Sequence, residues 1–214
     1  RKNSSREASL VKKLLIKHKL KLLILNNKFK INKNIQGQAR NMRYKMLINF
    51  CKKKKIKTLL TAHNLEDQVE TFFIRLSRGS GLTGLSAMKP LSKLNSSIGL
   101  FRPLLDVKKK SLIKISKTIF GKYIIDPSNK NEKYLRTKVR NLRKHLSLSG
   151  IDYDQIFRSI NNLASSKETL EGYLKEVFKK TIKKVGQKEV LINFKKFNSF
   201  NDEVKMRVIN ESIK

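Results

Sequence analysis

The sequence predicts an α/β fold with a parallel sheet, followed by a smaller and mainly helical domain. Helix-type and strand-type apolar patterns alternate over residues 4–77, which is typical of chains that build parallel sheets. After a short linker-like segment at 148–150 the pattern changes to long-range helical periodicity. Hydrophobic residues make up 39% of the 214 residues, enough for a sizeable core. We therefore predict a first domain at 1–147 and a second at 148–214.

The amino-terminal segments alternate in the order that a βα-type layer requires. Apolar residues at helical spacing predict amphipathic helices over 4–17 and 38–54. A short apolar run between them predicts a strand at 21–25, and the polar stretch 29–36 is expected to be a loop.

The stretch from 57 to 77 combines a strand, a tight turn and a helix. Residues 57–62 form a short apolar run with two threonines, and Asn64 stands where a helix N-cap is expected, with Asp67 three residues later. His63 therefore falls at the carboxyl end of a strand, where open α/β sheets bind ligands. Asp67 lies one helical turn further on and is able to face the same site. Taken singly, His63 also fits a surface histidine and Asp67 a helix-dipole acid.

The helix predicted over 65–77 is followed by the basic, glycine-broken loop Arg78-Gly79-Ser80-Gly81, which also fits an ordinary helix C-cap. Further elements are then expected in sequence. In the first domain they are extended segments at 84–90 and 98–103 around a polar loop at 92–97, a helix at 108–120, an extended piece at 123–125, a turn at 126–129 and a helix at 134–146. In the second they are a long helix at 152–184, a strand at 189–194 and a helix at 203–213.

The charge of the chain points to a polyanionic partner. The formal net charge is +34, with 50 Lys and Arg against 16 Asp and Glu, so nucleic acid is the natural partner. The abundance of Lys, Asn and Ile also fits AT-rich coding, and we expect both causes to contribute. A membrane surface is the weaker alternative, and no apolar run is long enough to span a bilayer. Cys51 is the one cysteine, which excludes an internal disulfide or a cysteine cluster and fits a cytoplasmic protein.

Residues 61–88, TAHNLEDQVETFFIRLSRGSGLTGLSAM, resemble the signature of the tRNA(Ile)-lysidine synthetases, members of the PP-loop (N-type) ATP pyrophosphatase superfamily. Three shorter motifs agree. Residues 38–44 resemble the family's AR-x-x-RY motif, 101–105 its RPLL motif and 126–129 its DPSN motif. The resemblance covers nearly all of 1–146 well and the remainder weakly.

The resemblance implies a PP-loop ATPase domain of the adenine nucleotide alpha hydrolase-like type, followed by a helical domain that helps to hold tRNA. PP-loop enzymes bind the ATP phosphates with a Ser-Gly-Gly-x-Asp-Ser loop after the first strand, and this sequence contains none. We therefore expect a fragment, incomplete at its amino terminus, of a longer chain rather than a degenerate enzyme, and we expect the fragment alone to be inactive.

The reaction implied by the resemblance is an ATP-dependent ligation that modifies tRNA. The C2 oxygen of the wobble cytidine in an isoleucine tRNA with a CAU anticodon attacks the α-phosphate of ATP and releases pyrophosphate. The ε-amine of free L-lysine then displaces AMP and forms lysidine. Mg²⁺ is expected to offset charge on the triphosphate.

The resemblance also assigns roles to residues. Asp67 and His63 are the expected catalytic residues, and Asp67 is the expected metal ligand. Arg136 and Arg140 lie four residues apart on the helix at 134–146, and Arg143 extends the same basic side, so these three are expected to bind tRNA. The expected ATP- and phosphate-binding residues are Arg40, Arg43, Arg78, Gly79, Ser80 and Gly81. Arg40 and Arg43, one turn apart, present two guanidinium groups together, although a solvated basic helix face is the alternative.

Two rival functions remain. Another PP-loop tRNA-modifying enzyme, such as a tRNA thiolase, is one, although thiolases that use paired cysteines are disfavoured because Cys51 stands alone. The other is a basic RNA-binding module without catalysis, which the missing phosphate loop favours. A homodimer is left open.

Overall fold

The computed structural model describes residues 4–27, 35–125, 134–184 and 189–213. The turn predicted at 126–129 and most of the loop predicted at 29–36 lie outside these residues. The chain forms two compact units, one of Arg1–Ile74 with Met88–Tyr153 and one of Arg75–Ala87 with Asp154–Lys214. None of the helices in the described residues is both long enough and apolar enough to cross a membrane.

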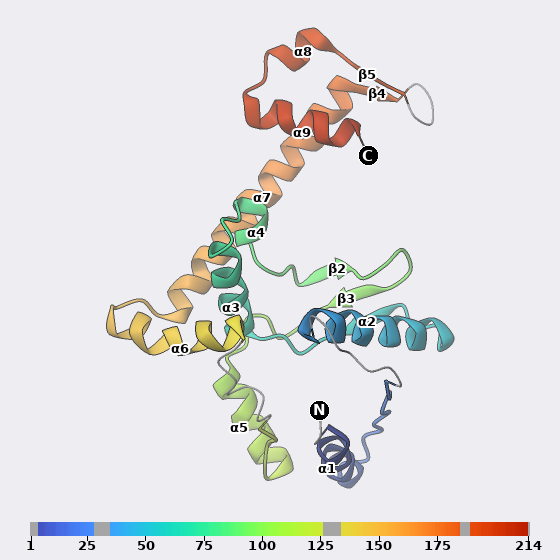
Figure 1. Ribbon diagram of the computed structural model, residues 1–214, viewed down its shortest axis with the longest axis vertical. Helices are drawn as coiled ribbons and strands as arrows, with labels where there is room; N and C mark the ends of the chain where they lie inside the picture. The colour runs from blue at the N-terminus through green and yellow to red at the C-terminus, as the bar shows by residue number, and fades with distance from the viewer. Residues whose placement is uncertain (1–3, 28–34, 126–133, 185–188, 214) are drawn as a thin grey trace. The chain divides into compact units, whose positions relative to one another are not determined.

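The first unit contains a small sheet and most of the helices (Figure 1). The helices at 4–17, 108–120 and 134–146 are confirmed to within two residues at each end, and the helix predicted over 38–54 begins earlier. Its elements are α1 (Ser4–Lys17), α2 (Ile35–Lys53), β1 (Thr58–Leu60), most of α3 (Leu65–Leu76), β2 (Leu91–Lys93), β3 (Gly99–Phe101), α5 (Lys109–Phe120) and α6 (Leu135–Leu148).

The sheet has the order β1-β3-β2. Strands β1 and β3 are parallel, with Leu59 opposite Leu100, as the alternating pattern predicts. Strand β2 is antiparallel to β3, so the described sheet is mixed. The cause is the polar loop between them, in which Asn95 Oδ1 accepts hydrogen bonds from the N–H groups of Ser97 (2.9 Å) and Ile98 (2.8 Å) and folds the chain back as a hairpin.

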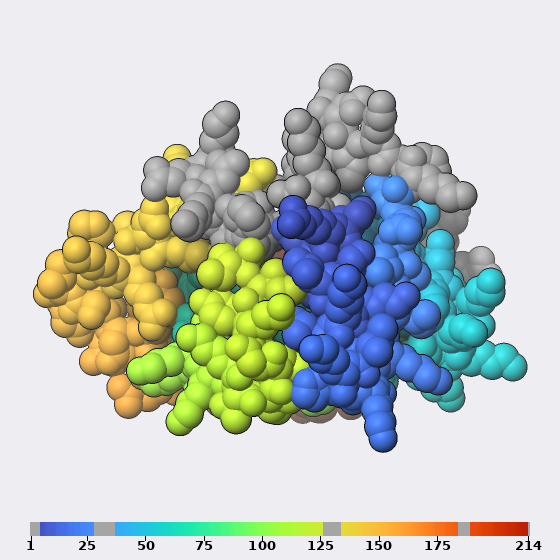
Figure 2. All heavy atoms as spheres, turned by 90° about the horizontal axis from the view of Figure 1, so that it is seen from below, coloured from blue at the N-terminus to red at the C-terminus, as the bar shows by residue number. Residues whose placement is uncertain are grey.

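The core of the first unit includes buried residues of α3, β3 and α6. Val69 of α3 is fully buried, and Leu65, Leu100 and Val139 are nearly so. Helix α1 lies beside α5, as Figure 2 shows, and the rings of His18 and Phe120 meet edge to face at a centroid distance of 4.8 Å.

The strand predicted at 21–25 is wrong, and the extended piece predicted at 123–125 is not part of a sheet. Residues 21–25 and 123–125 have no regular structure, and Leu23 is 67% exposed. A strand needs a partner for its backbone hydrogen bonds, and no strand among the described residues pairs with either segment. The extended segment predicted at 84–90 is also wrong in part, because its first residues belong to the short helix α4 (Leu82–Leu85).

The second unit is mainly helical, as the sequence predicts. Its core consists of Leu174, Val177, Val204 and Val208, and the long helix α7 leads into the other elements around that core (Figure 1). The elements of the second unit are α4, α7 (Tyr153–Thr181, from Asp154 on), β4 (Ile182–Lys184), β5 (Val190–Ile192), α8 (Phe194–Asn198) and α9 (Asp202–Ser212).

The strand predicted at 189–194 and the helix predicted at 203–213 are confirmed as β5 and α9. The helix predicted over 152–184 ends at Thr181 instead, because Ile182 pairs with Ile192 across an antiparallel β4–β5 hairpin. The short helix α8 was not predicted from the sequence.

Candidate functional site

His63 lies just after β1, at the carboxyl end of the strand. The Thr61 N–H donates to the Phe101 carbonyl (2.9 Å), which continues the parallel pairing past the end of β1. The Thr61 hydroxyl and His63 Nδ1 are hydrogen-bonded at 2.9 Å. The imidazole is half-buried. Because Thr61 holds Nδ1, Nε2 is the ring nitrogen placed to meet a ligand.

Asp67 and Asn64 form a reciprocal capping box at the start of α3. The Asp67 N–H donates to Asn64 Oδ1 (3.0 Å), and the Asn64 N–H donates to Asp67 Oδ2 (3.1 Å). The predicted N-cap is therefore confirmed, and Asp67 has a structural role in it. Its other carboxylate oxygen, Oδ1, accepts no hydrogen bond within the part of the chain that the structure describes. Asp67 thus closes the helix start and keeps one oxygen for a ligand.

Several charged groups act on the His63 imidazole. Burial is the main cause of its lowered pKa, and the Asp67 carboxylate raises the pKa in opposition. The guanidinium groups of Arg102, Arg136 and Arg40 lower it further, so His63 is neutral at pH 7. Three of the residues predicted for the site, Arg40, Asp67 and Arg136, thus act on the ring of a fourth, His63.

Helix α3 buries two glutamates, which is unusual for unpaired acids. Glu66 and Glu70 are 8% and 2% exposed. Glu66 Oε2 accepts a hydrogen bond from the Lys109 N–H (2.8 Å), which fixes the first turn of α5. Both carboxylates also face arginines of α6, so the two helices are joined by charge as well as by apolar packing.

Glu70 is held by two arginines of α6. Arg140 binds it in a bidentate manner, with its Nη2 atom 3.1 Å from Oε2, and Arg136 Nε lies 3.2 Å from Oε2. Arg136 Nη2 also donates to the Thr71 hydroxyl (3.3 Å). Burial raises the pKa of Glu70, and the hydrogen bond from Arg140 opposes that rise. The Arg136 and Arg140 guanidiniums are therefore anchored on the α3 side.

Arg143 is the most exposed of the three α6 arginines, which form a row along the helix with Arg136 and Arg140. The Arg143 side chain is 59% exposed, and its Nη1 atom lies 3.7 Å from Glu66 Oε1. Its guanidinium also stacks on the Tyr153 ring at 4.7 Å from the centroid. Three arginines thus face two carboxylates, and one positive charge of the row is not balanced within it.

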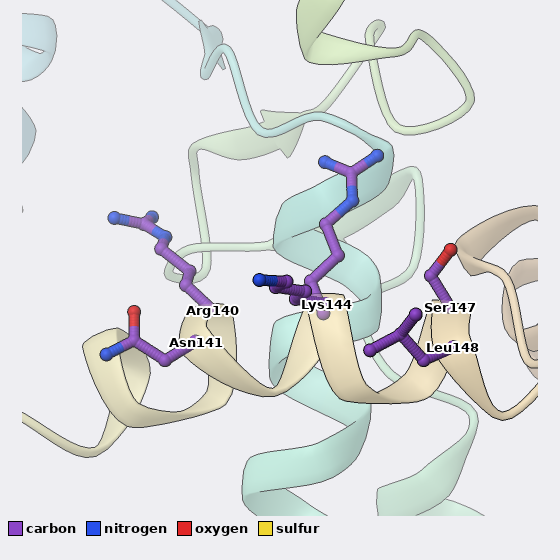
Figure 3. Close-up of a pocket in the computed structure, with 6 residues that line it drawn as sticks. Arg140, Asn141, Lys144, Ser147 and Leu148 are labelled. Carbon is purple, nitrogen blue, oxygen red and sulfur yellow. The ribbon is translucent and has the colours of Figure 1, made fainter.

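A groove of about 630 Å³ is lined by side chains of α6. Figure 3 shows the labelled side chains of this groove along one side of α6, where the helix crosses α3. Three of its side chains are cationic, and two carry neutral hydrogen-bonding groups. The groove is lined by Arg140, Asn141, Arg143, Lys144, Ser147 and Leu148. Its three cationic side chains suit a phosphate-bearing backbone.

The arginines predicted on α2 are both exposed. The Arg40 guanidinium lies over the Tyr44 ring at 5.0 Å from its centroid, which fixes its direction. Arg40 also acts on His63, and Arg43 lies one turn further along the same helix.

The loop Arg78-Gly79-Ser80-Gly81 lies in the second unit and ends α3 as a Schellman motif. The Gly79 N–H donates to the Leu76 carbonyl (2.9 Å), and the Ser80 N–H donates to the Arg75 carbonyl (3.1 Å). Gly79 has φ +67°, the left-handed conformation that this motif requires. Gly79 and Ser80 are predicted to bind phosphate, and their backbone N–H groups are thus already engaged within the protein, whereas the Arg78 side chain is exposed.

Sequence reasoning missed Thr61, Glu66, Glu70, Arg102 and Lys144. A signal was present for the two glutamates, since they lie four residues apart on α3, directly beside the apolar Leu65 and Val69. Acidic residues are scarce in this chain, so two on an apolar face indicate buried partners for cations.

Residues 1–146 match the model of the PP-loop domain family. The chain is 38% identical over 191 residues to the tRNA(Ile)-lysidine synthase of Wolbachia pipientis wMel, and this match covers 89% of the chain and 44% of that protein. It is 42% identical over 150 residues to the tRNA(Ile)-lysidine synthase of Orientia tsutsugamushi (strain Boryong), covering 70% of the chain and 34% of that protein. The chain thus spans less than half the length of these relatives.

The structure resembles that of the U34-tRNA thiolase NcsA from Methanococcus maripaludis with its [4Fe-4S] cluster. The TM-score is 0.55 at 17% identity, over 76% of this chain and 57% of that chain. Similarity at this identity concerns the fold alone, and it supports the α/β class predicted from the sequence.

Proposed function

The chain belongs to the PP-loop domain family, and from this premise we propose that the whole protein is an ATP-dependent tRNA(Ile)-lysidine synthase. It would join L-lysine to C2 of the wobble cytidine of an isoleucine tRNA with a CAU anticodon, through an adenylated cytidine, with release of pyrophosphate and AMP. The observation that carries the proposal is the 38% identity to such an enzyme over 89% of the chain. The cluster around His63 adds a site of matching chemistry.

The residues of that cluster have different roles in this proposal, according to their charge. The Arg40 guanidinium of this cluster, together with Arg43 one turn further along α2, neutralises phosphate oxygens of ATP as charge develops in the attack on the α-phosphate. Neutral His63, held at Nδ1 by Thr61, hydrogen-bonds a phosphate or the base through Nε2. Asp67 directs its remaining carboxylate oxygen at a cation or at the attacking cytidine.

Asp67 also fits a Mg²⁺ ion that is bound together with ATP. Mg²⁺ in nucleotide sites usually takes one or two carboxylates, and substrate phosphates and water complete its shell. The described residues contain no group of three or more His, Cys, Asp or Glu, so Asp67 would act as a single protein ligand here. The ion would offset the negative charge of the triphosphate.

We assign tRNA binding to the groove on α6 and to the predicted second domain at 148–214. Arg136 and Arg140 form ion pairs with Glu70, so RNA is able to bind only those guanidinium N–H groups that are not engaged there. Arg143 and Lys144 are exposed in the groove and are the cations best placed to bind tRNA phosphates. Arg78 is a further exposed cation for phosphate, with Gly79, Ser80 and Gly81 setting its position.

The first prediction tests the activity itself. The full-length protein, incubated with ATP, Mg²⁺, L-lysine and the CAU-anticodon isoleucine tRNA, is expected to form lysidine. Nucleoside analysis by mass spectrometry detects the lysine adduct of cytidine. An isoleucine tRNA with a GAU anticodon is the control, and it is expected to stay unmodified. Pyrophosphate release without a lysine adduct, or a thiolated uridine, would contradict the proposal.

The second prediction concerns the groove on α6. Lys144→Gln is expected to lower tRNA affinity and to reduce the slope of log K against log salt by roughly one unit, because one phosphate contact is lost. Lys138→Gln is the matched control, since Lys138 is an exposed lysine of the same helix outside the groove. Filter binding over a salt series measures both. Equal slopes for the two variants would remove the groove from the tRNA interface.

A further inference from the structure

The second unit carries an aromatic ring that is unusually exposed. Phe194, the first residue of α8, is 70% exposed. Its ring stacks on that of Phe197, with 6.4 Å between centroids and 23° between planes. One face of the Phe194 side chain is thus supported, and most of the remainder meets solvent.

The support behind Phe194 is rigid. Phe197 packs against the buried cluster of Leu174, Val177, Val204 and Val208. Asn193 Oδ1 caps α8 by accepting from the Lys196 N–H (3.1 Å), and the Asn193 N–H donates to the Thr181 carbonyl (2.8 Å). Hydrogen bonding of Asn193 to the end of α7 and packing of Phe197 on the core therefore fix the position of α8, which carries the exposed Phe194 ring.

The hairpin beside α8 presents an apolar and a basic side chain together. Leu191 of β5 is opposite Lys183 of β4, so the two share one face of the ribbon. Leu191 is 61% exposed, and Lys183 is also exposed. Lys195 follows Phe194 and is exposed as well. The sequence of this corner, residues 179–201, holds seven lysines and one acid.

An exposed aromatic ring in a lysine-rich segment favours one chemical class of partner. A purely apolar partner would have to desolvate the lysines, whereas a polyanion with flat rings satisfies both groups. We propose that Phe194 is a stacking site for an unpaired base of RNA, with Lys183 and Lys195 binding the adjoining phosphates. The inference rests on the proposed function in taking tRNA as the RNA that supplies such a base.

The first test uses fluorescence in the full-length protein. The 214 residues contain no tryptophan, so Phe194→Trp places an indole at the site and no other in this stretch. Titration with a short single-stranded oligoribonucleotide is expected to quench the signal added by the substitution, because the base stacks on the indole. Double-stranded RNA of the same composition is expected to quench it far less. Tyr173→Trp is the control, since Tyr173 is also exposed (51%) but lies on α7, where no ring of the described residues stacks on it.

The second test measures affinity. Phe194→Leu keeps an apolar side chain and removes the ring, and it is expected to weaken single-strand binding by about 5- to 100-fold, the range for loss of one stacked base. Tyr173→Leu is expected to leave it unchanged. Equal affinities for Phe194→Leu and the unsubstituted protein would overturn the inference, and a lowered melting temperature in that case would show that protein covers the ring. Lysidine formation at saturating tRNA tests the proposed function separately.

Discussion

Asp67→Asn in the full-length protein is expected to abolish pyrophosphate release, with a loss of about 100-fold or more, while the fold and tRNA binding remain largely intact. The asparagine keeps the size of the side chain and an oxygen able to accept the Asn64 N–H, so the capping box is preserved. What it removes is the negative charge, which a metal ion or a polarised base requires. Pyrophosphate release with tRNA and ATP measures the effect.

The Asp67→Asn substitution needs a control, because Asp67 also caps α3 through its hydrogen bonds with Asn64. Asn64→Asp is the matched variant, since aspartate is an equally good N-cap and leaves Asp67 in place. Thermal melting of both variants should give values close to that of the unsubstituted protein. Near-normal pyrophosphate release together with a lowered melting temperature for Asp67→Asn would reduce Asp67 to a helix-start residue.

The segment from β1 to α3 was predictable because its determinants are local. The apolar run of β1, the capping residues Asn64 and Asp67 and the periodicity of α3 all lie within about twenty residues, and each acts through neighbours in sequence. The position of His63 at a strand end follows from these elements. Its hydrogen bond to Thr61 did not follow, because it depends on the side-chain directions of the turn.

The ion pairs between α3 and α6 could not be predicted in the same way. Glu70 and Arg140 are 70 residues apart, and nothing local to either indicates the other. The arginines of α6 were therefore interpreted from their spacing alone as a basic face for tRNA. In the structure these arginines pair with Glu66 and Glu70 of α3, and two of them, Arg140 and Arg143, also line the groove on α6.

The segment 21–25, wrongly predicted as a strand, and helix α4 show two other limits of prediction from sequence. An apolar run predicts a strand only if a partner strand is adjacent, and pairing is a non-local property. At α4 the chain turns where Gly84 packs against Ser80, and a Cβ at Gly84 would lie 2.5 Å from Ser80 Cβ. That close approach requires glycine, but the glycine alone does not predict a helix over an extended segment.

Glu70→Gln is expected to destabilise the protein by about 2–4 kcal/mol. Removing one partner of a buried ion pair commonly costs more than a surface pair contributes, because the remaining charge stays desolvated. Here two guanidiniums, those of Arg136 and Arg140, would be left against a neutral amide. The side chains of Arg136 and Arg140 are 38% and 29% exposed, so water relieves part of the cost. We therefore expect less than the largest values seen for fully buried ion pairs, about 5 kcal/mol. The free energy of unfolding in urea at neutral pH measures it.

Glu203→Gln supplies the comparison that separates burial from pairing. Glu203 also meets an arginine, with Oε1 2.7 Å from Arg207 Nη2, but its side chain is 66% exposed. Its loss should change the free energy of unfolding by less than about 1 kcal/mol. Because Arg136 acts on His63 and is anchored on Glu70, Glu70→Gln should also reduce the rate of pyrophosphate release, whereas Glu203→Gln should not. Equal destabilisation by the two substitutions would show that the α6 arginines are held by packing rather than by the Glu70 carboxylate.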